Sequence, residues 1–310
     1  MIDVIVPVYK PDKRFYDLIS MLKRQKIQAK HYIFINTERR FWKEEFLQGI
    51  ENAEVYHITK EEFDHGKTRR MGAELSTSPI MIFMTQDAVP ADEMVFTHLV
   101  DSFSDPQVAV SYARQLPNRD CKMIERFTRG FNYPKESRIK TKKDLEEMGI
   151  KTYFCSNVCA AYRKEDYIKL GGFVEKTIFN EDMLFAAKAI EAGKAVAYVA
   201  EAKVYHSHNE KVLPLFQRNF DLAVSQQQYK AVFEGISSEA EGIKLVKKTV
   251  THLLREKKWY LIPKLVINSG AKYLGYQMGK HYERLPQKVV LCCTSNREYW
   301  RNYGKNTRRI

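Results

Sequence analysis

The sequence predicts an α/β protein with a mostly parallel sheet flanked by helices and a helical, basic C-terminal region. Short runs of β-branched residues alternate with helical stretches over the first part of the chain, and such alternation implies right-handed βαβ crossovers. The C-terminal part lacks this alternation and reads as helical. With 310 residues, of which 44% are hydrophobic and 29% charged, the chain can bury a full core.

The expected elements follow from these local patterns. Strands are expected where short runs are rich in β-branched residues, at 2–8, 32–35, 54–57, 80–84, 108–115, 153–162, 195–199 and 203–205. Helices are expected at 15–25, 41–47, 67–75 and 181–192, and the chain reads as helical from 213 to 282, where Pro263 breaks or kinks one helix. Residues 117–150 form a polar, basic insertion whose length is typical of a functional or mobile loop.

The net charge of +13 lies at the C-terminal end. Residues 243–310 contain 16 Lys and Arg against three acids, so the first 242 residues are close to neutral. A neutral body with a basic end argues against nucleic acid and favours one face directed at an anionic surface. Aromatic residues are interleaved with these charges and suit a lipid headgroup layer: Trp259, Tyr260, Tyr273, Tyr276, Tyr282, Tyr299, Trp300 and Tyr303.

The sequence has no run that approaches the roughly 18 consecutive apolar residues of a membrane span. We therefore expect a cytoplasmic protein that is peripheral on the inner face of the cell membrane. The C-terminal helices are also a candidate contact for a homo-oligomer.

Polar residues follow three of the expected strands. Tyr9, Asn36 and Asp87 each come just after a strand, and ligands of parallel sheets bind beyond the carboxyl ends of the strands. In Thr85-Gln86-Asp87-Ala88, the Asp87 carboxylate is suited to hold Mg²⁺ or Mn²⁺ while a diphosphate supplies further oxygens. The alternative is that Asp87 caps the helix expected after Pro90.

Three further groups each allow a functional and a structural interpretation. Glu181 and Asp182 open a helix, where they either complement the helix dipole or supply a general base. His206 and His208 follow a strand, where an imidazole either ligates a metal, contacts phosphate or is satisfied by hydrogen bonds. The segment 65–70, His-Gly-Lys-Thr-Arg-Arg, suits either a phosphate at a helix start or a solvated basic face.

Taken in order, these motifs resemble the inverting GT-A glycosyltransferases of family two. The motifs are Pro7-Val8-Tyr9, Arg69, Asp87, Gly171-Gly172-Phe173, Glu181-Asp182 and His206. Within that family the sequence is similar to the bacterial rhamnosyltransferase branch at 65–69, 85–88, 112–117, 131–134, 156–157 and 205–208. The resemblance implies a GT-A catalytic domain at 1–212, with a nucleotide-sugar half at about 1–115 and an acceptor half at about 116–212, before the helical region 213–310.

The resemblance also implies roles for individual residues. Asp182 would be the catalytic base, next to Glu181. The nucleotide sugar would be bound by Pro7, Val8, Tyr9, Asn36, Arg69, Gln86 and Asp87. The loop facing donor and acceptor would contain Gly171, Gly172, Phe173 and Arg114, and the metal ligands would be Asp87 and His206.

Two positions depart from the family pattern. Thr85 replaces the first acid of the family's Asp-x-Asp motif, so Asp87 is left as the motif's one carboxylate. Asn36 stands where the family often has an Asp that reads the base.

The activity implied is transfer of L-rhamnose from dTDP-L-rhamnose, with inversion, to a hydroxyl of a polyprenyl-diphosphate-linked glycan of a bacterial surface polysaccharide. One alternative is the same chemistry with another nucleotide sugar. The other is a non-catalytic membrane or nucleic-acid binding protein, and the neutral body and the joint presence of Asp87 and Asp182 argue against it.

Overall fold

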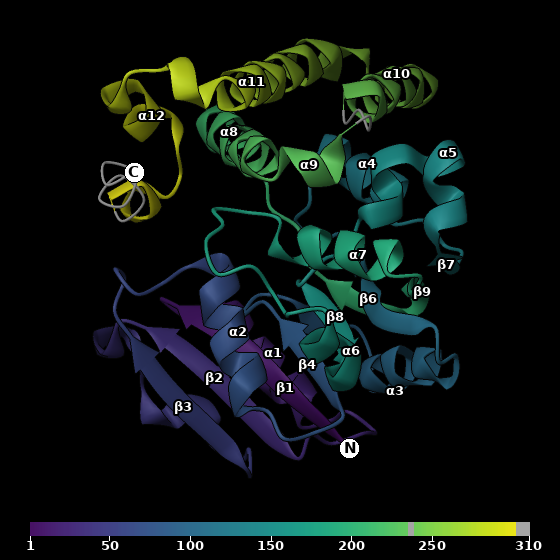
Figure 1. Cartoon of the computed structure of the whole chain (residues 1–310). Coiled ribbons are helices and arrows are strands. Elements are labelled where there is room, and N and C mark those ends of the chain that lie inside the picture. The colour runs from purple at the N-terminus through teal and green to yellow at the C-terminus, as the bar shows by residue number, and fades with distance from the viewer. Residues whose placement is uncertain (235–238, 302–310) are drawn as a thin grey trace. The chain divides into compact units, whose positions relative to one another are not determined.

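The chain folds into two compact units, seen in a computed structural model (Figure 1). The structure describes residues 1–234 and 239–301, so Tyr303 of the aromatic C-terminal set lies outside the described residues. The first unit, called the sheet unit here, is made of 1–119, 132–176 and 181–207. The second, called the helical unit, is made of 120–131, 177–180 and the described residues from 208 onward.

One sheet organises the sheet unit. Its strands are β1 (Ile2–Tyr9), β2 (His31–Thr37), β3 (Ala53–Ile58), β4 (Ile80–Met84), β5 (Val89–Pro90), β6 (Val108–Leu116), β7 (Arg138–Lys140), β8 (Cys159–Arg163) and β9 (Ala195–Tyr205). They lie in the order β3-β2-β1-β4-β8-β6-β9-β5, and β7 pairs with β9. The first four run parallel, as the βαβ alternation predicts, whereas β8 is antiparallel to both β4 and β6.

Helices pack on both faces of the sheet in the sheet unit. They include α1 (Lys13–Leu22), α2 (His65–Leu75), α3 (Val95–Asp101), α5 (Leu145–Met148), α6 (Lys164–Lys169) and α7 (Glu181–Glu191). Phe15 and Leu18 of α1 are fully buried in one cluster with Val4 and Val6 of β1, and each such side chain contributes roughly 1.5–3 kcal/mol. Ile5 points to the other face. There it touches α2 so closely that a Cβ on Gly72 would lie 2.4 Å from its Cγ2 atom. These layers confirm the predicted α/β class.

Several expected elements differ from the observed ones. The helix expected at 41–47 is wrong: two 3₁₀ turns, Arg39–Phe41 and Glu44–Leu47, stand there instead. They carry Trp42 and Phe46 onto Phe15, with ring centroids 6.0 and 5.5 Å away, and this aromatic packing overrides a regular helix. The strand expected at 153–162 begins only at Cys159.

The basic insertion and the end of the sheet unit also differ from expectation. Residues 117–150 are not a plain loop, since they contain α4 (Met123–Asn132), β7 and α5. The strands expected at 195–199 and 203–205 are one strand, β9, whose pairing with β6 shifts register between Val199 and Lys203. A bulge keeps the strand continuous where the sequence pattern is interrupted.

The helical unit contains the helices that follow the sheet unit in sequence. They are α8 (Val212–Gln228), α9 (Lys230–Phe233), α10 (Glu239–Arg255), η6 (Trp259–Leu261), α11 (Ile262–Lys280), η7 (Tyr282–Arg284) and α12 (Gln287–Cys293). Pro263 does not break or kink a helix, because it lies in the first turn of α11, where its missing N–H is not needed. In the stretches that the structure describes, no helix combines the length and apolarity needed to cross a membrane.

A small core of its own holds the helical unit together. Phe220 and Val224 of α8 are fully buried in a cluster with Tyr282, Tyr299 and Trp300. These three aromatic rings are therefore core residues, and the expectation that they face a lipid headgroup layer is wrong. Tyr276 is partly buried and donates a hydrogen bond to Gln226.

A buried carboxylate fixes the amino end of the parallel strands. Asp3 is fully buried, and one of its oxygens accepts hydrogen bonds from the Ser76 hydroxyl and the Thr77 and Ser78 amides at 2.7–2.9 Å. Its other oxygen accepts from the Ser78 hydroxyl at 2.8 Å and the His31 amide at 3.2 Å. Asp3 thus joins the starts of β1 and β2 to the turn between α2 and β4.

Replacing this carboxylate should destabilise the fold. In Asp3→Asn, the NH2 group of the new amide would face N–H and O–H groups that now donate to the carboxylate. We expect the free energy of unfolding, measured by urea denaturation, to fall by roughly 1–3 kcal/mol. Asp17→Asn, at an exposed acid of α1, should change it little and is the matched control. Equal stability of the two variants would contradict the assignment.

The same contacts predict a pH dependence of stability. Burial alone raises the pKa of Asp3, but hydrogen bonds from Ser76, Ser78 and Thr77 outweigh it and hold the pKa below its usual range. The contribution of Asp3 is therefore present above the unfolded-state pKa of about 3.9, and it is lost as the pH falls through the lower folded-state pKa. In the Asp3→Asn variant this acid-induced loss should be smaller.

Candidate active site

The ends of β1 and β4 are tied together by one amide side chain. The Tyr9 backbone N–H donates to Gln86 Oε1 at 2.7 Å, and Gln86 Nε2 donates to the Tyr9 carbonyl at 2.9 Å. Gln86 thus acts like a neighbouring strand and holds the loop after β4 against the end of β1. The Tyr9 ring is exposed and stands edge-on to Phe41, with ring centroids 5.7 Å apart.

Asp87 follows in the same loop and faces a histidine at the end of the sheet. The distance from Asp87 Oδ2 to His206 Nε2 is 3.6 Å, and Arg14 Nη1 of α1 lies 3.7 Å from the same oxygen. Asp87 lies outside α3, which begins at Val95 with Met94 as its N-cap, so the helix-cap alternative is wrong.

His206 is oriented by a hydrogen bond on its other ring nitrogen. His206 Nδ1 lies 3.0 Å from Gln115 Oε1, while Gln115 Nε2 donates to the Ser156 hydroxyl at 3.0 Å. Because an amide oxygen only accepts, Nδ1 carries a proton, and Nε2 is the ring nitrogen that faces Asp87. Second hydrogen bonds of this kind orient metal-binding histidines.

Asp87, His206 and His208 form the candidate metal site. Their ligand atoms all lie within 4.8 Å of one another. One carboxylate oxygen and two imidazole nitrogens are ligands that suit a divalent cation and leave coordination positions for other oxygens. The donor set therefore fits a divalent metal ion, even with Thr85 in place of an acid.

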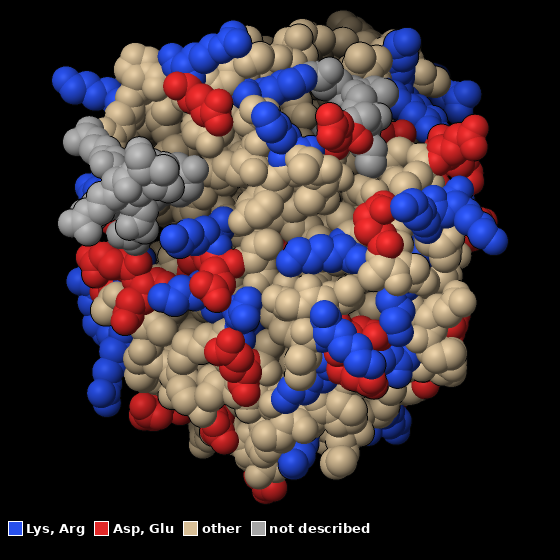
Figure 2. All heavy atoms as spheres, viewed as in Figure 1, with Lys and Arg blue, Asp and Glu red and all other residues tan. Residues whose placement is uncertain are grey.

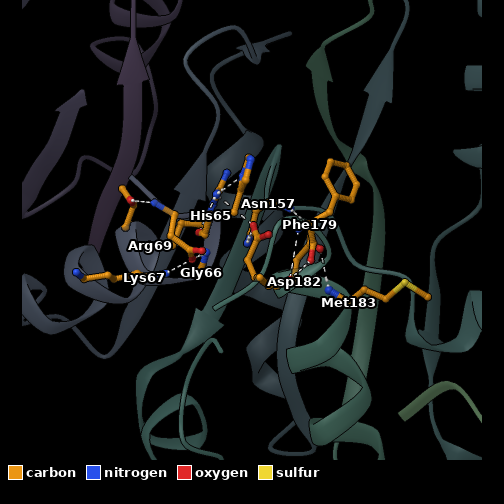
Figure 3. Close-up of polar contacts among 12 residues, drawn as sticks. His65, Gly66, Lys67, Arg69, Asn157, Phe179, Asp182 and Met183 are labelled. Carbon is orange, nitrogen blue, oxygen red and sulfur yellow. Dashed lines mark hydrogen bonds and ion pairs between the residues drawn. The ribbon is translucent and has the colours of Figure 1, made fainter. Parts of the chain in front are cut away.

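The acid pair lies at the start of α7, and its two carboxylates have different partners. Glu181 is buried, and its Oε1 atom lies 3.2 Å from Arg69 Nη1 and accepts from Asn157 Nδ2 at 3.1 Å. Asp182 is partly exposed, and its two oxygens accept from the Asn157 and Met183 amides at 2.9 and 2.8 Å (Figure 3). Asn157 thus contacts both acids, one with its side chain and one with its backbone.

These environments separate the pKa values of the two acids. Burial and the neighbouring Glu181 raise the pKa of Asp182 to about 7. Burial also acts to raise the pKa of Glu181, but the charges of Arg69 and His65 outweigh it and keep that pKa below its usual range. Glu181 therefore stays ionised, while Asp182 can exchange a proton near neutral pH.

Arg69 and the helix start before it are occupied within the protein. Arg69 is buried, and besides pairing with Glu181 it donates to the His65 carbonyl at 3.1 Å. The Gly66 and Lys67 amides donate to the Asp64 carboxylate, so they are not available to a phosphate. Segment 65–70 is thus neither a phosphate cradle nor simply a solvated face.

The glycine pair is required by the backbone. Gly171 and Gly172 have φ angles of 78° and 65°, and a Cβ on Gly172 would lie 2.9 Å from the Tyr167 ring. Arg70 donates to the Gly171 carbonyl at 3.2 Å. Phe173 is fully buried among aromatic rings, so it supports this loop from the core and does not line a binding surface.

The remaining predicted residues lie at strand ends or within strands. Pro7 and Val8 are in β1, paired with Ile35 and Asn36 of β2. Arg114, in β6, is partly exposed and pairs with Lys203 of β9 across the register shift.

The Asn36 side chain uses its amide nitrogen, but not its amide oxygen, for hydrogen bonds within the described part of the chain. Its Nδ2 donates to the Glu38 carbonyl at 3.1 Å and lies 3.1 Å from His57 Nδ1. Its buried Oδ1 has no hydrogen-bond partner among the residues that the structure describes.

The sequence patterns missed several residues that build the site. Lys140 is buried, donates to the carbonyls of Lys151 and Phe154, and lies over the Tyr112 ring at 4.9 Å. It thereby fixes the segment that leads to Asn157, and burial lowers its pKa to about 7. A lysine in a basic insertion gives no sequence signal of burial. Arg14 was missed as well, and Asn157 was noted only within the branch resemblance at 156–157 without a role, because their partners are distant in sequence.

Comparison with known proteins identifies the class of enzyme. Residues 3–171 match the family model described as glycosyl transferase family 2, which covers more than half of the chain. The chain therefore belongs to glycosyl transferase family 2, and it is a glycosyltransferase, as its motifs predict. The matched stretch includes Asp87 and ends at Gly171, before the acid pair.

Two curated relatives resemble the chain over nearly its whole length, which confirms the predicted rhamnosyltransferase branch. The chain is 37% identical over 305 residues to the O-antigen chain rhamnosyltransferase RfbN of Salmonella typhimurium, covering 97% of this chain and 96% of that protein. It is 35% identical over 304 residues to the O-antigen chain rhamnosyltransferase WbaN of Salmonella anatum, covering 96% and 95%.

Solved structures share the GT-A fold. The mannosyltransferase PcManGT from Pyrobaculum calidifontis, in complex with GDP-Man and Mn²⁺, has a TM-score of 0.55 at 14% identity, over 99% of this chain and 86% of that one. TarS 1–349 of S. aureus, in complex with UDP-GlcNAc, has a TM-score of 0.52 at 15% identity, over 91% of both chains. At these identities the likeness concerns the fold alone.

Breaking the buried ion pair should destabilise the protein. Arg69→Met would leave Glu181 buried without its counter-charge, and we expect a loss of roughly 3–5 kcal/mol in the free energy of unfolding by urea denaturation. Arg70→Met is the matched control. The Arg70 side chain is 36% exposed, pairs with the exposed Glu74 and Glu175 and donates to the Gly171 carbonyl, and its loss leaves no buried charge unpaired, so it should cost roughly 1–2 kcal/mol. Similar losses in both variants would contradict the special role of Arg69.

Proposed function

We propose that the protein transfers L-rhamnose from dTDP-L-rhamnose to a hydroxyl of a lipid-linked bacterial surface polysaccharide, with inversion at the anomeric carbon. The observation that carries the proposal is the acid pair, in which Asp182 is held by two backbone amides beside an ionised Glu181. The sugar is taken from the two rhamnosyltransferase relatives. For a β-linked donor the product is an α-L-rhamnoside.

Asp182 is the general base of this reaction. Its carboxylate accepts the proton of the acceptor hydroxyl while that oxygen attacks the anomeric carbon from the side opposite the diphosphate. A single displacement of this kind inverts the configuration. The Asn157 and Met183 amides keep the carboxylate in one orientation throughout.

Glu181 acts as a positioning residue. It is buried against Arg69 and Asn157, so it supports the base from behind and stays ionised. Its negative charge also helps to keep the pKa of Asp182 high enough for the carboxylate to accept a proton. Arg69 in turn acts through Glu181, which assigns it to the support of the base instead of the diphosphate.

The donor base is read by Asn36. Its amide nitrogen is engaged by Glu38 and His57, so the oxygen is the atom left to form a further hydrogen bond. An amide oxygen accepts a hydrogen bond, and the N3–H of thymine is a donor that can supply one.

Asp87 and His206 would hold a divalent metal ion, Mg²⁺ or Mn²⁺, with His208 as a third ligand. When bound, the metal neutralises charge that develops on the departing diphosphate. Arg14, which lies 3.7 Å from Asp87, adds a positive charge at the same place. Tyr9 and Gln86 frame the nucleotide at the ends of β1 and β4, and Pro7 and Val8 shape the strand beneath it.

The proposed acceptor implies that the enzyme also contacts a membrane. A glycan on a polyprenyl diphosphate is anionic and held in the membrane, so the enzyme works at the cytoplasmic face as a peripheral protein. Gly171, Gly172 and Arg114 lie on the acceptor side of the site. The basic C-terminal region provides the contact with an anionic surface, and its helices are the place where copies of the chain would associate.

Loss of the base should abolish turnover. With dTDP-L-rhamnose and a lipid-linked acceptor, Asp182→Asn should lower kcat by about 10²–10⁴-fold, while Glu175→Gln, at an exposed acid, should leave it unchanged. In the parent enzyme kcat should fall below about pH 7, because the base must be unprotonated. Near-normal turnover of folded Asp182→Asn would remove Asp182 from this role.

A panel of nucleotide sugars, assayed by nucleotide release with the same acceptor, tests the donor. The proposal expects dTDP-L-rhamnose to be the preferred donor. A clear preference for a GDP or UDP sugar would instead support the same chemistry with another sugar.

Metal binding should depend on Asp87. In the presence of dTDP, titration of Mn²⁺ by calorimetry or electron paramagnetic resonance should show binding weakened about 10–100-fold in Asp87→Asn, with loss of a ligand. Asp101→Asn, at an exposed acid of α3, should bind as the parent protein does. Unchanged Mn²⁺ affinity in Asp87→Asn would show that the metal lies elsewhere.

A further inference from the structure

Helix α11 exposes an apolar face to solvent. Its exposed positions recur every three or four residues, which places them on one side of the helix. The large apolar side chains on that side are Val266, Ile267, Tyr273 and Leu274, each between 57% and 59% exposed. Trp259 and Tyr260 of η6 precede them at 67% and 56% exposure. We call these six residues the apolar ridge.

The opposite side of α11 is locked against α8. A Cβ on Gly275 would lie 2.2 Å from the Phe216 carbonyl oxygen, and one on Gly279 would lie 2.2 Å from that of Phe220. The two helix backbones therefore approach as closely as glycine permits. Since this contact fixes the rotation of α11, the helix cannot turn its apolar ridge into the core of the helical unit.

The structure separates the aromatic residues of the basic C-terminal region into two groups. Tyr282, Tyr299 and Trp300 are buried in the core of the helical unit. Trp259, Tyr260 and Tyr273 belong to the apolar ridge and are exposed. Aromatic side chains with a polar tip are typical of the boundary between lipid headgroups and acyl chains. Only the second group is placed for that boundary.

The charges beside the apolar ridge indicate what covers it. Lys257 and Lys264 are exposed next to the ridge residues, and Lys280 is exposed at the end of α11. From 255 to 281 the sequence has six Lys and Arg against the single acid Glu256. Figure 2 shows Lys and Arg side chains over the helical unit, at the top of the view. Two copies meeting through this face would bring like charges together, whereas anionic lipid headgroups would neutralise them.

We propose that the apolar ridge docks the enzyme on an anionic membrane, with its apolar side chains at the headgroup–acyl boundary and the flanking lysines on the headgroups. The proposal deepens the proposed function, on which it rests for the membrane-held acceptor. The affinity of the protein for the membrane then comes from insertion of the apolar ridge as well as from charge.

Vesicle flotation of the full chain tests the ridge. The parent protein should float with vesicles of phosphatidylcholine and phosphatidylglycerol, and Val266→Asp/Ile267→Asp should bind at least about 10-fold more weakly. Ile168→Asp is the control, because it places one acid at a 63% exposed residue of α6, outside the apolar ridge. Its vesicle binding should equal that of the parent protein. Lys257→Gln/Lys264→Gln should reduce binding to anionic vesicles and its sensitivity to salt.

Trp259 gives a second, direct measurement. It is exposed, whereas Trp42 and Trp300, the other tryptophans of the protein, are buried. Lipids with brominated acyl chains should therefore quench the fluorescence of the parent protein, and Trp259→Phe should lose most of that quenching. Quenching that persists unchanged in Trp259→Phe would overturn the docking geometry.

Two outcomes overturn the proposal. One is equal vesicle binding by the parent protein and by folded Val266→Asp/Ile267→Asp. The other is a change from dimer to monomer in that variant by light scattering with vesicle binding unaltered, which would make the ridge an interface between copies.

A separate assay distinguishes this proposal from the proposed function. With a short, water-soluble acceptor, the ridge variant should turn over as the parent protein does. Absence of rhamnosyl transfer in the parent protein would contradict the proposed function while leaving the vesicle result valid.

Discussion

The candidate active site depends on the buried ion pair between Arg69 and Glu181. Arg69 comes from α2 and Glu181 from the first turn of α7, and Asn157 joins them from the segment before β8. A lone buried carboxylate would be neutral or destabilising, so Glu181 requires its arginine. The same pairing fixes the start of α7 and with it the direction of Asp182. The environment of the partly exposed Asp182 is therefore set by contacts between buried side chains.

Much of the fold follows from local sequence patterns, and the exceptions have physical causes. The β-branched runs of β1, β2 and β4 are short and apolar, so the sequence locates each strand of the parallel half of the sheet, with ends that differ by at most two residues. The expected helix at 41–47 fails because Trp42 and Phe46 gain more by packing on Phe15 than by continuing a helical repeat. Tertiary contacts of this kind leave no local signal.

The sequence predicts the two carboxylates on which the proposed function depends, but not the residues that hold them in place. Asp87 and Asp182 stand out because they follow a strand and begin a helix. Asn157 and Arg14 do not, since their roles arise from partners that are distant in sequence. Arg69 shows the converse: its position in the motif was recognised, but its burial against Glu181 could not be read from spacing. The composition also locates the basic charge in the C-terminal region. Only the packing shows which aromatic residues of that region are buried and which are exposed.

In the reaction proposed for this enzyme, the pKa of about 7 at Asp182 has a consequence for the cycle between turnovers. A carboxyl group of ordinary acidity would hold the acceptor's proton weakly and would accept it late in the displacement. A much more basic group would keep the proton after the sugar had moved, and each enzyme molecule would wait for a second base before reacting again. Asp182 lies between these limits, so it can return the proton to water unaided. In the proposed reaction, the environment that raises the pKa of Asp182 enough for it to act as the base would also let the enzyme reset itself.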